Sequence, residues 1–149
     1  MKLHDLLAGL PGHTVAGDTG VEVGAVRSDS REVKPGDVFV AVKGIRSDGH
    51  AFVKIAIEQG AAAIVVERAP GVATGTAAVI TVRSSADALG VMIGNALGNP
   101  ARAMTLVGIT GTNGKTTTSY LVESILHAAG HEVGVIGTVT YRWKRTSFD

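Results

Sequence analysis

The segment Gly111–Thr117 contains the residue types that hold a phosphate chain. Glycines let backbone N–H groups approach phosphate oxygens with no Cβ in the way, and a helix beginning here adds the partial positive charge of its N-terminus. The Lys115 ammonium can then reach the β- and γ-phosphates, while the Thr116 hydroxyl can ligate a bridging magnesium ion. We therefore predict an ATP and Mg2+ site with Lys115 as the catalytic cation and Thr116 as the metal ligand. Its nucleotide-binding residues are Gly111, Thr112, Asn113, Gly114, Lys115, Thr116 and Thr117.

This loop departs from the general pattern G-x-x-x-x-G-K-[ST] at its first position. The pattern places a glycine five residues before Gly114, where the chain has Ile109, and the nearby Gly108 is one residue out of register. An alternative interpretation is a glycine turn that opens a helix whose first lysine is merely solvated. Because a cation in the first helical turn opposes the helix dipole, a bound anion explains Lys115 better.

The loop needs a strand before it and a helix after it. The apolar run Met104–Thr110 predicts a strand, the spacing of apolar residues predicts a helix over Lys115–Ala129, and Val133–Ile136 predicts a returning strand. Residues 101–149 therefore form the first β-loop-α-β unit of a P-loop ATPase domain. One such unit cannot bury both faces of a sheet, so we expect this domain to be cut short at Asp149.

Upstream, helical and strand patterns alternate, which predicts a small α/β domain over residues 1–100 with crossover connections between strands. Gly98-Asn99-Pro100 marks its end. Ser84 or Ser85 is a candidate N-cap, and Gly60 a candidate helix end. The predicted helices are Leu3–Leu10, Ala51–Gln59 and Ser85–Leu97, and the predicted strands are Val21–Ala25, Val38–Val42, Ala62–Val66 and Ala78–Val82.

Composition excludes several classes of protein. The chain has no cysteine, which removes disulfides, thiolate metal sites and thiol nucleophiles and favours a cytoplasmic location. It has 14 basic and 13 acidic residues with three Phe, two Tyr and one Trp, so we expect no nucleic-acid partner. No signal peptide and no apolar stretch of about 18 residues is present, so we expect no membrane insertion. We expect a monomer.

Two sets of motifs resemble the Mur ligases of peptidoglycan synthesis. The first is Gly108–Thr118, reading GITGTNGKTTT, with the later Gly134–Thr138. The ATP loop of this family also keeps only the last glycine pair, so Ile109 agrees with the resemblance. The second is Ser28–Arg31, Lys34–Gly44 and Asp48–Phe52, which resemble the uridine-nucleotide-binding domain of the MurE type. The resemblance covers residues 20–141.

The resemblance implies an ATP-dependent ligase that adds an amino acid, meso-diaminopimelate in many bacteria and lysine in others, to UDP-N-acetylmuramoyl-L-alanyl-D-glutamate. In this family ATP converts a poorly electrophilic carboxylate into an acyl phosphate, which the incoming amine attacks. The family's acidic magnesium ligand, its carbamylated lysine and its C-terminal domain would all follow Asp149. We therefore expect the chain to be an N-terminal fragment without turnover of its own.

By the same resemblance, the UDP moiety would contact Ser28, Ser30, Ile45, Arg46 and Ser47. Hydroxyls in a tight turn can bond uracil edges or diphosphate oxygens. The alternative is that Asp29 and Ser30 close an Asx-type turn while Arg31 pairs with a nearby acid. For Asp48 and His50, capping of the next helix is favoured over ligand contact. The terminal basic residues Arg142–Arg145 are interpreted as a solvated end.

Three alternatives remain for the whole chain. A MurF-type ligase has similar motifs, although the loop and Gly134–Thr138 favour the MurE type. A non-catalytic module would bind the UDP-sugar peptide but not ATP. An unrelated P-loop NTPase or kinase would need an acid after the next strand, where the chain has Gly137-Thr138.

Overall fold

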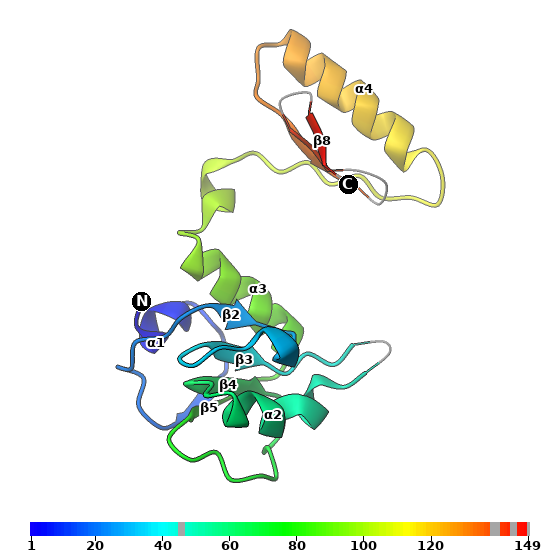
Figure 1. The fold of residues 1–149 in the computed structure, drawn as a ribbon. Helices are drawn as coiled ribbons and strands as arrows, with labels where there is room; N and C mark the ends of the chain where they lie inside the picture. Colours follow the sequence, from blue (N-terminus) through cyan, green and yellow to red (C-terminus); the bar gives the residue numbers. More distant parts are fainter. Residues whose placement is uncertain (45–46, 138–140, 144–145, 149) are drawn as a thin grey trace. The chain divides into compact units, whose positions relative to one another are not determined.

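The computed structural model describes residues 1–44, 47–137, 141–143 and 146–148. The chain divides into two compact units, Met1–Met104 and Thr105–Asp149, which are described separately (Figure 1).

The first unit is an α/β unit built on one five-stranded sheet. Its strands lie in the order β1-β5-β4-β3-β2. The pairs β2-β3, β3-β4 and β4-β5 are parallel, whereas β1 runs antiparallel to β5 at one edge. The elements are α1 (Leu3–Leu6), β1 (Thr14–Ala16), β2 (Val26–Arg27), the 3-10 turn η1 (Ser30–Glu32), β3 (Val38–Val40), the 3-10 turn η2 (Gly49–Phe52), α2 (Val53–Glu58), β4 (Ala63–Val66), β5 (Ala78–Thr81), α3 (Ser85–Ala96) and the 3-10 turn η3 (Pro100–Ala103). This arrangement confirms the predicted fold class.

Hydrophobic clusters cover both faces of this sheet. In β3, Val38 and Val40 pack with leucines of α1 and with Met92 of α3. Phe39, between them, points to the opposite face and packs with residues of α2. Figure 1 shows α3 and α2 on opposite faces of the sheet. An unbroken apolar run is therefore the pattern that this doubly covered strand requires.

The helix predicted over Leu3–Leu10 ends at Leu6, and residues 7–9 form turns instead. Two other predicted helix boundaries of the first unit are confirmed. The Ser84 side chain accepts the backbone N–H of Asp87 at the start of α3. Gly60 follows α2 with a φ of 89°, in the left-handed region that favours glycine.

The strand predicted over Val21–Ala25 is wrong. The sheet strand β2 begins at Val26, and the residues before it pair with the N-terminus instead, with Leu3 donating to Val21 O and Val23 donating to Met1 O. Alternating apolar residues show which side chains are buried but not which backbone partner they have. The short edge strand β1 was not predicted.

The second unit contains α4 (Lys115–Ala128) and the strands β6 (Gly134–Ile136), β7 (Tyr141–Trp143) and β8 (Thr146–Phe148). The strands form an antiparallel sheet in the order β6-β7-β8. The predicted helix is confirmed, and β6 lies within the returning strand predicted over Val133–Ile136. That strand pairs with β7 in an antiparallel hairpin, which the sequence analysis did not predict.

The strand predicted over Met104–Thr110 is not formed. Residues 105–110 have no regular secondary structure and pair with none of the described strands. Leu106 and Val107 are 73% and 61% exposed. A strand requires a neighbour to accept and donate its backbone hydrogen bonds, and an apolar run by itself does not supply one.

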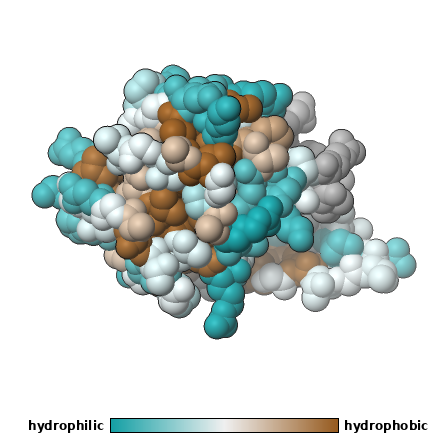
Figure 2. Space-filling view, turned by 90° about the horizontal axis from the view of Figure 1, so that it is seen from below, coloured by the Kyte–Doolittle hydropathy of each residue, from teal (hydrophilic) through white to brown (hydrophobic). Residues whose placement is uncertain are grey.

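The face of the molecule seen in Figure 2 carries its hydrophobic residues in small patches separated by hydrophilic ones. None of the helices in the described parts of the chain combines the length and the hydropathy needed to span a membrane.

Candidate nucleotide-binding sites

The predicted phosphate loop immediately precedes α4. Gly111 and Gly114 have φ values of 145° and 77°, which side-chain-bearing residues rarely adopt. A Cβ built on Gly114 would meet no atom within 4 Å. The requirement for glycine at this position is therefore conformational: it lets the backbone turn into the helix at Lys115.

The Lys115 ammonium lies against its own loop. Its Nζ donates to the carbonyl oxygen of Gly111 at 2.6 Å and lies 3.4 Å from that of Thr112. The side chain thus folds back over the loop instead of extending away from it. An anion held in the loop would be within reach of the same ammonium.

The backbone donors at this helix start are available to a ligand. The first N–H that bonds into the turn is that of Thr118, which donates to Gly114 O at 2.8 Å. Among the described residues, the N–H groups of residues 113–117 have no acceptor. Such a row of unpaired amides at a helix N-terminus fits phosphate oxygens.

The loop offers fewer groups to a magnesium ion than it offers to phosphate oxygens. Thr116 supplies one hydroxyl, and no cluster of three His, Asp or Glu side chains that could hold a metal occurs in the described parts of the chain. Magnesium usually keeps several waters and takes phosphate oxygens as ligands. Thr116 would therefore be one ligand among waters and phosphates.

Three of the predicted uridine-nucleotide residues, Ser28, Ser30 and Ser47, follow neighbouring strands of the first unit's sheet. Ser28 follows β2 and Ser47 lies in the connection after β3. Since β2 and β3 are parallel, their carboxyl ends meet at the same edge, where ligands of open α/β sheets bind. Ser28 and Ser47 are exposed, whereas Ser30 is only 8% exposed. Ile45 and Arg46 lie outside the described residues.

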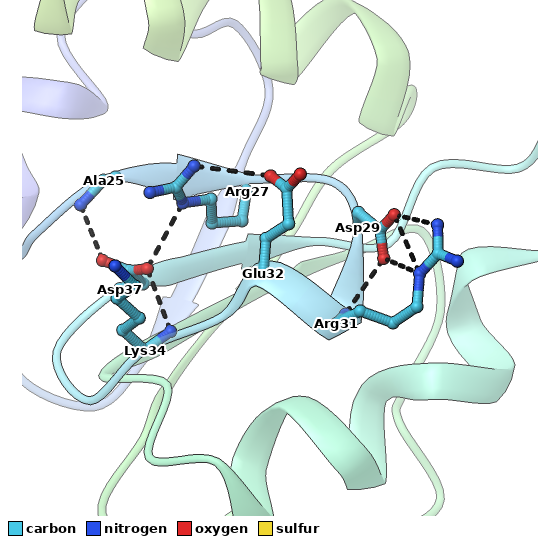
Figure 3. A network of polar contacts seen from close by, with 7 residues as sticks. All are labelled: Ala25, Arg27, Asp29, Arg31, Glu32, Lys34 and Asp37. Atoms are coloured by element: carbon cyan, nitrogen blue, oxygen red, sulfur yellow. Dashed lines mark hydrogen bonds and ion pairs between the residues drawn. The ribbon is translucent and has the colours of Figure 1, made fainter.

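Asp29 and Arg31 form the turn that holds this serine pair (Figure 3). The Asp29 carboxylate accepts the Arg31 backbone N–H at 3.0 Å and its guanidinium Nε at 2.9 Å. The hydrogen bond from the Arg31 side chain is the main cause that lowers the pKa of Asp29 to about 2, and the bond from the Arg31 backbone N–H is the second. The Asx-type turn is therefore formed, and the acid that pairs with Arg31 is Asp29 itself. This turn leaves Ser28 exposed. The Asx-type turn is therefore compatible with the predicted contact between Ser28 and the UDP moiety.

A second acid anchors the preceding strand. Asp37, whose side chain is 7% exposed, accepts the backbone N–H of Ala25 at 2.8 Å and that of Lys34 at 3.0 Å. Its other contact is with Arg27 at 3.4 Å, and Arg27 also reaches Glu32 at 3.4 Å (Figure 3). These contacts hold the start of β2 and the η1 turn together.

Charged residues missed by the sequence analysis follow β4 at the same edge. Arg68 donates to Asp48 at 2.8 Å, and this hydrogen bond is the main cause of the lowered pKa of Asp48. Glu67 accepts the backbone N–H and the hydroxyl of Ser85, each at 2.8 Å, and these two bonds lower the pKa of Glu67. A Glu-Arg pair directly after a buried strand was the signal that could have found them.

The motif Asp48-Gly49-His50 has three separate structural roles. Asp48 caps η2 by accepting the His50 backbone N–H at 3.0 Å, which confirms its predicted capping role. A Cβ on Gly49 would lie 2.7 Å from the carbonyl oxygen of Val42, so only glycine fits there. His50 is not a cap: its ring contacts Asp48 and the backbone of Glu67.

In the second unit, Arg142 is not part of a solvated end. Its side chain is 10% exposed, and its guanidinium pairs with Glu123 at 2.9 Å and lies 3.8 Å from the centre of the Tyr120 ring. Arg142 of β7 is thus joined to α4 by an ion pair and by a contact with an aromatic ring. Lys144 and Arg145 lie outside the described residues.

Two family models match the chain in consecutive segments. Residues 22–96 match the model described as Mur ligase family, catalytic domain, and residues 109–149 match the Mur ligase middle domain. The parallel sheet of the first unit and the glycine loop of the second lie within these segments. The chain belongs to the Mur ligase family.

Its relatives include MurE enzymes. A UDP-N-acetylmuramoyl-L-alanyl-D-glutamate--2,6-diaminopimelate ligase from Parabacteroides distasonis is 44% identical over 93% of the chain, which covers 29% of that protein. A solved structure of a ligase with this name matches 99% of the chain, and the chain covers 29% of it, with a TM-score of 0.68 and 22% identity, so it shows the fold alone. A MurF ligase from Thermotoga maritima in complex with ADP is 40% identical over 70% of the chain and 23% of its own, with a TM-score of 0.50. The chain thus spans less than a third of the length of these proteins.

Proposed function

We propose that the chain is the nucleotide-binding N-terminal part of a MurE-type ligase in peptidoglycan synthesis. Residues 1–100 bind the UDP moiety of UDP-N-acetylmuramoyl-L-alanyl-D-glutamate at the carboxyl edge of β2, β3 and β4. Residues 101–149 bind the phosphates of ATP and Mg2+ in the loop 111–117. The amino acid added by the whole ligase is diaminopimelate, in keeping with the name of the Parabacteroides distasonis relative.

The observation that carries this proposal is the position of Lys115. Its ammonium lies over a glycine loop, 2.6 Å from Gly111 O, next to amides that have no acceptor among the described residues. An ammonium, a helix N-terminus and inward-turning amides together fit a triphosphate. The relative solved with ADP supports the same class of ligand.

Within the whole ligase, Lys115 would neutralise charge on the transferred phosphoryl group, and Thr116 would ligate the metal. Bound ATP supplies the phosphoryl group that makes a carboxylate electrophilic. Ser28 and Ser47 would contact the UDP moiety from two neighbouring strand ends. Because the chain spans 29% of its MurE relatives, we expect these residues to bind without completing the ligation.

Calorimetric titration with UDP and, separately, with Mg-ATP tests the proposal. We expect both ligands to bind, and we expect no ATP-dependent phosphate release with UDP-muramoyl dipeptide and diaminopimelate. Phosphate release coupled to ligation by this chain alone would contradict the fragment assignment. Failure of both ligands to bind would overturn the proposal as a whole.

A second candidate function is a module that binds the UDP-sugar peptide but not ATP. It is favoured by residues 105–110, which precede the phosphate loop and pair with none of the described strands. A loop is less rigid when the segment before it pairs with no strand, and a less rigid loop binds phosphate more weakly. Binding of UDP without binding of Mg-ATP would support this candidate.

A further inference from the structure

His50 joins two strand ends of the first unit through both nitrogens of its ring. The side chain is 6% exposed. Its Nδ1 lies 2.6 Å from Asp48 Oδ1, and its Nε2 lies 2.9 Å from the backbone nitrogen of Glu67. Asp48 ends the connection that follows β3, whereas Glu67 directly follows β4.

These two contacts determine where the imidazole proton lies. A backbone N–H can only donate, so Nε2 must present its lone pair to Glu67. Nδ1 therefore carries the proton and donates to the Asp48 carboxylate. The ring is the neutral Nδ1–H tautomer, because a doubly protonated ring would bring an N–H against the Glu67 N–H.

Both partners of the ring are themselves held. The second carboxylate oxygen of Asp48 accepts from Arg68 at 2.8 Å. The Glu67 carboxylate accepts two hydrogen bonds from Ser85, at the start of α3. The ring therefore lies between two groups that are fixed on neighbouring elements of the sheet.

The held segment includes a residue of the proposed UDP site. Lys43 and Asp48 form an isolated antiparallel bridge, and Gly44 N donates to Ser47 O at 2.9 Å. Ser47, which is exposed, is thus held by this backbone hydrogen bond and directly precedes the Asp48 carboxylate that His50 binds. The backbone at Gly49 also approaches Val42 too closely for a Cβ, which fixes the other side of the same connection.

We propose that His50 is a positioning residue of the UDP site. As the neutral Nδ1–H tautomer it ties the connection after β3 to the end of β4, and so places Ser47 at the carboxyl edge where the uridine diphosphate binds. This inference rests on the proposed function of the first unit. His50 itself does not contact the nucleotide.

Two conservative variants separate the two halves of this contact. In His50→Gln the side-chain oxygen can accept the Glu67 N–H, and in His50→Asn the amide can donate to Asp48. In His50→Phe a ring of similar shape has neither group. We expect His50→Phe to weaken UDP binding about tenfold, because the connection that carries Ser47 loses its hydrogen bonds to the end of β4. We expect His50→Gln to restore most of the affinity.

The experiment combines calorimetry with ring spectroscopy on the intact chain. UDP is titrated into the native chain and the three variants, with His4→Phe as a matched control, since the His4 side chain is 54% exposed. Long-range 1H–15N correlation spectra of the native chain report the tautomer of His50. Mg-ATP binding should be the same in all of these variants. Thermal melts establish which variants fold, and Gln and Asn provide the test if Phe does not.

The outcomes distinguish this inference from the proposed function. An Nδ1–H ring together with weakened UDP binding in His50→Phe, rescued by Gln, supports the positioning role. An Nε2–H ring overturns the positioning role of His50 and leaves the proposed function intact. A folded His50→Phe chain that binds UDP as the native chain does has the same consequence. A native chain with an Nδ1–H ring that binds no UDP overturns the proposed function and the positioning role with it.

Discussion

The carboxylate of Asp37 accepts the backbone N–H of Ala25 at 2.8 Å, joining the turn before β3 to the start of β2. The approach is so close that a Cβ on Gly24 would lie 2.5 Å from Asp37 Oδ1. Asp37 is itself nearly fully buried and satisfies two backbone donors, those of Ala25 and Lys34. The start of β2, and with it Ser28 at its end, is therefore held by this carboxylate as well as by pairing with β3.

Replacing Asp37 should destabilise the first unit. In Asp37→Ala the N–H groups of Ala25 and Lys34 lose their acceptor, and we expect the free energy of unfolding to fall by about 2–4 kcal/mol. Asp37→Asn keeps one acceptor oxygen and should lose less. Urea denaturation measures both. The matched control is Glu32→Gln, since Glu32 is 63% exposed and its pair with Arg27 is worth under about 1 kcal/mol. Equal losses in Asp37→Ala and Glu32→Gln would contradict the anchoring role.

Two glycine-to-alanine changes should have opposite signs. At Gly49 the new Cβ would meet backbone atoms of Val42 at 2.7 and 2.8 Å, so the connection after β3 must shift. At Gly90, inside α3, nothing lies within 4 Å, and alanine favours the helix by about 0.5–1 kcal/mol. We expect Gly49→Ala to lower the melting temperature and weaken UDP binding, and Gly90→Ala to raise the melting temperature. A Gly49→Ala chain as stable as the native chain would show that this close approach is not required.

Removing the Lys115 ammonium should affect ATP binding without affecting folding. Lys115 is exposed, and the hydrogen bonds that its ammonium makes within the described parts of the chain go to carbonyl oxygens of its own loop. In Lys115→Ala we expect Mg-ATP affinity to fall at least about tenfold, which corresponds to roughly 1.4 kcal/mol. The melting temperature and UDP binding should be unchanged. Lys54→Ala removes another exposed lysine, in α2, and serves as the control for net charge. Equal Mg-ATP affinity in both variants would contradict the role of Lys115.

The ion pair of Asp29 and Arg31 predicts a specific acid titration. The pKa of Asp29 is lowered from 3.8 to about 2, chiefly by the Arg31 side-chain hydrogen bond. Since the folded-state pKa is the lower one, this stabilisation is complete above about pH 4 and is lost as the pH falls towards 2. Carboxyl 13C shifts measure the titration directly. Arg31→Gln should raise the pKa of Asp29 and leave Asp48 unchanged, whereas Arg68→Gln should raise only that of Asp48. An unchanged Asp29 titration in Arg31→Gln would refute the assignment.

Local signals in the sequence were sufficient for the elements that depend on near neighbours. Ser84 caps α3 and Gly60 follows α2 because cap and helix end are properties of a few consecutive residues. The apolar run at Val38 predicted a strand buried on both faces for a similar reason. The glycine loop before Lys115 was recognisable because its glycines and the start of α4 are consecutive in the chain.

Pairing and long-range contacts were decided only by the tertiary structure. The apolar residues of 21–25 and of 104–110 are both strand-like in sequence, yet residues 21–23 pair with the N-terminus and residues 105–110 pair with none of the described strands, since the choice of partner depends on segments remote in the chain. The sequence placed Asp48 at a cap, but it could not place Arg68, twenty residues later, against the same carboxylate. The sequence by itself therefore determined the family, the fold class and the position of the glycine loop before α4. Only folding brought the ends of β3 and β4 together around His50, because a hydrogen bond depends on distance in space and not on separation in sequence.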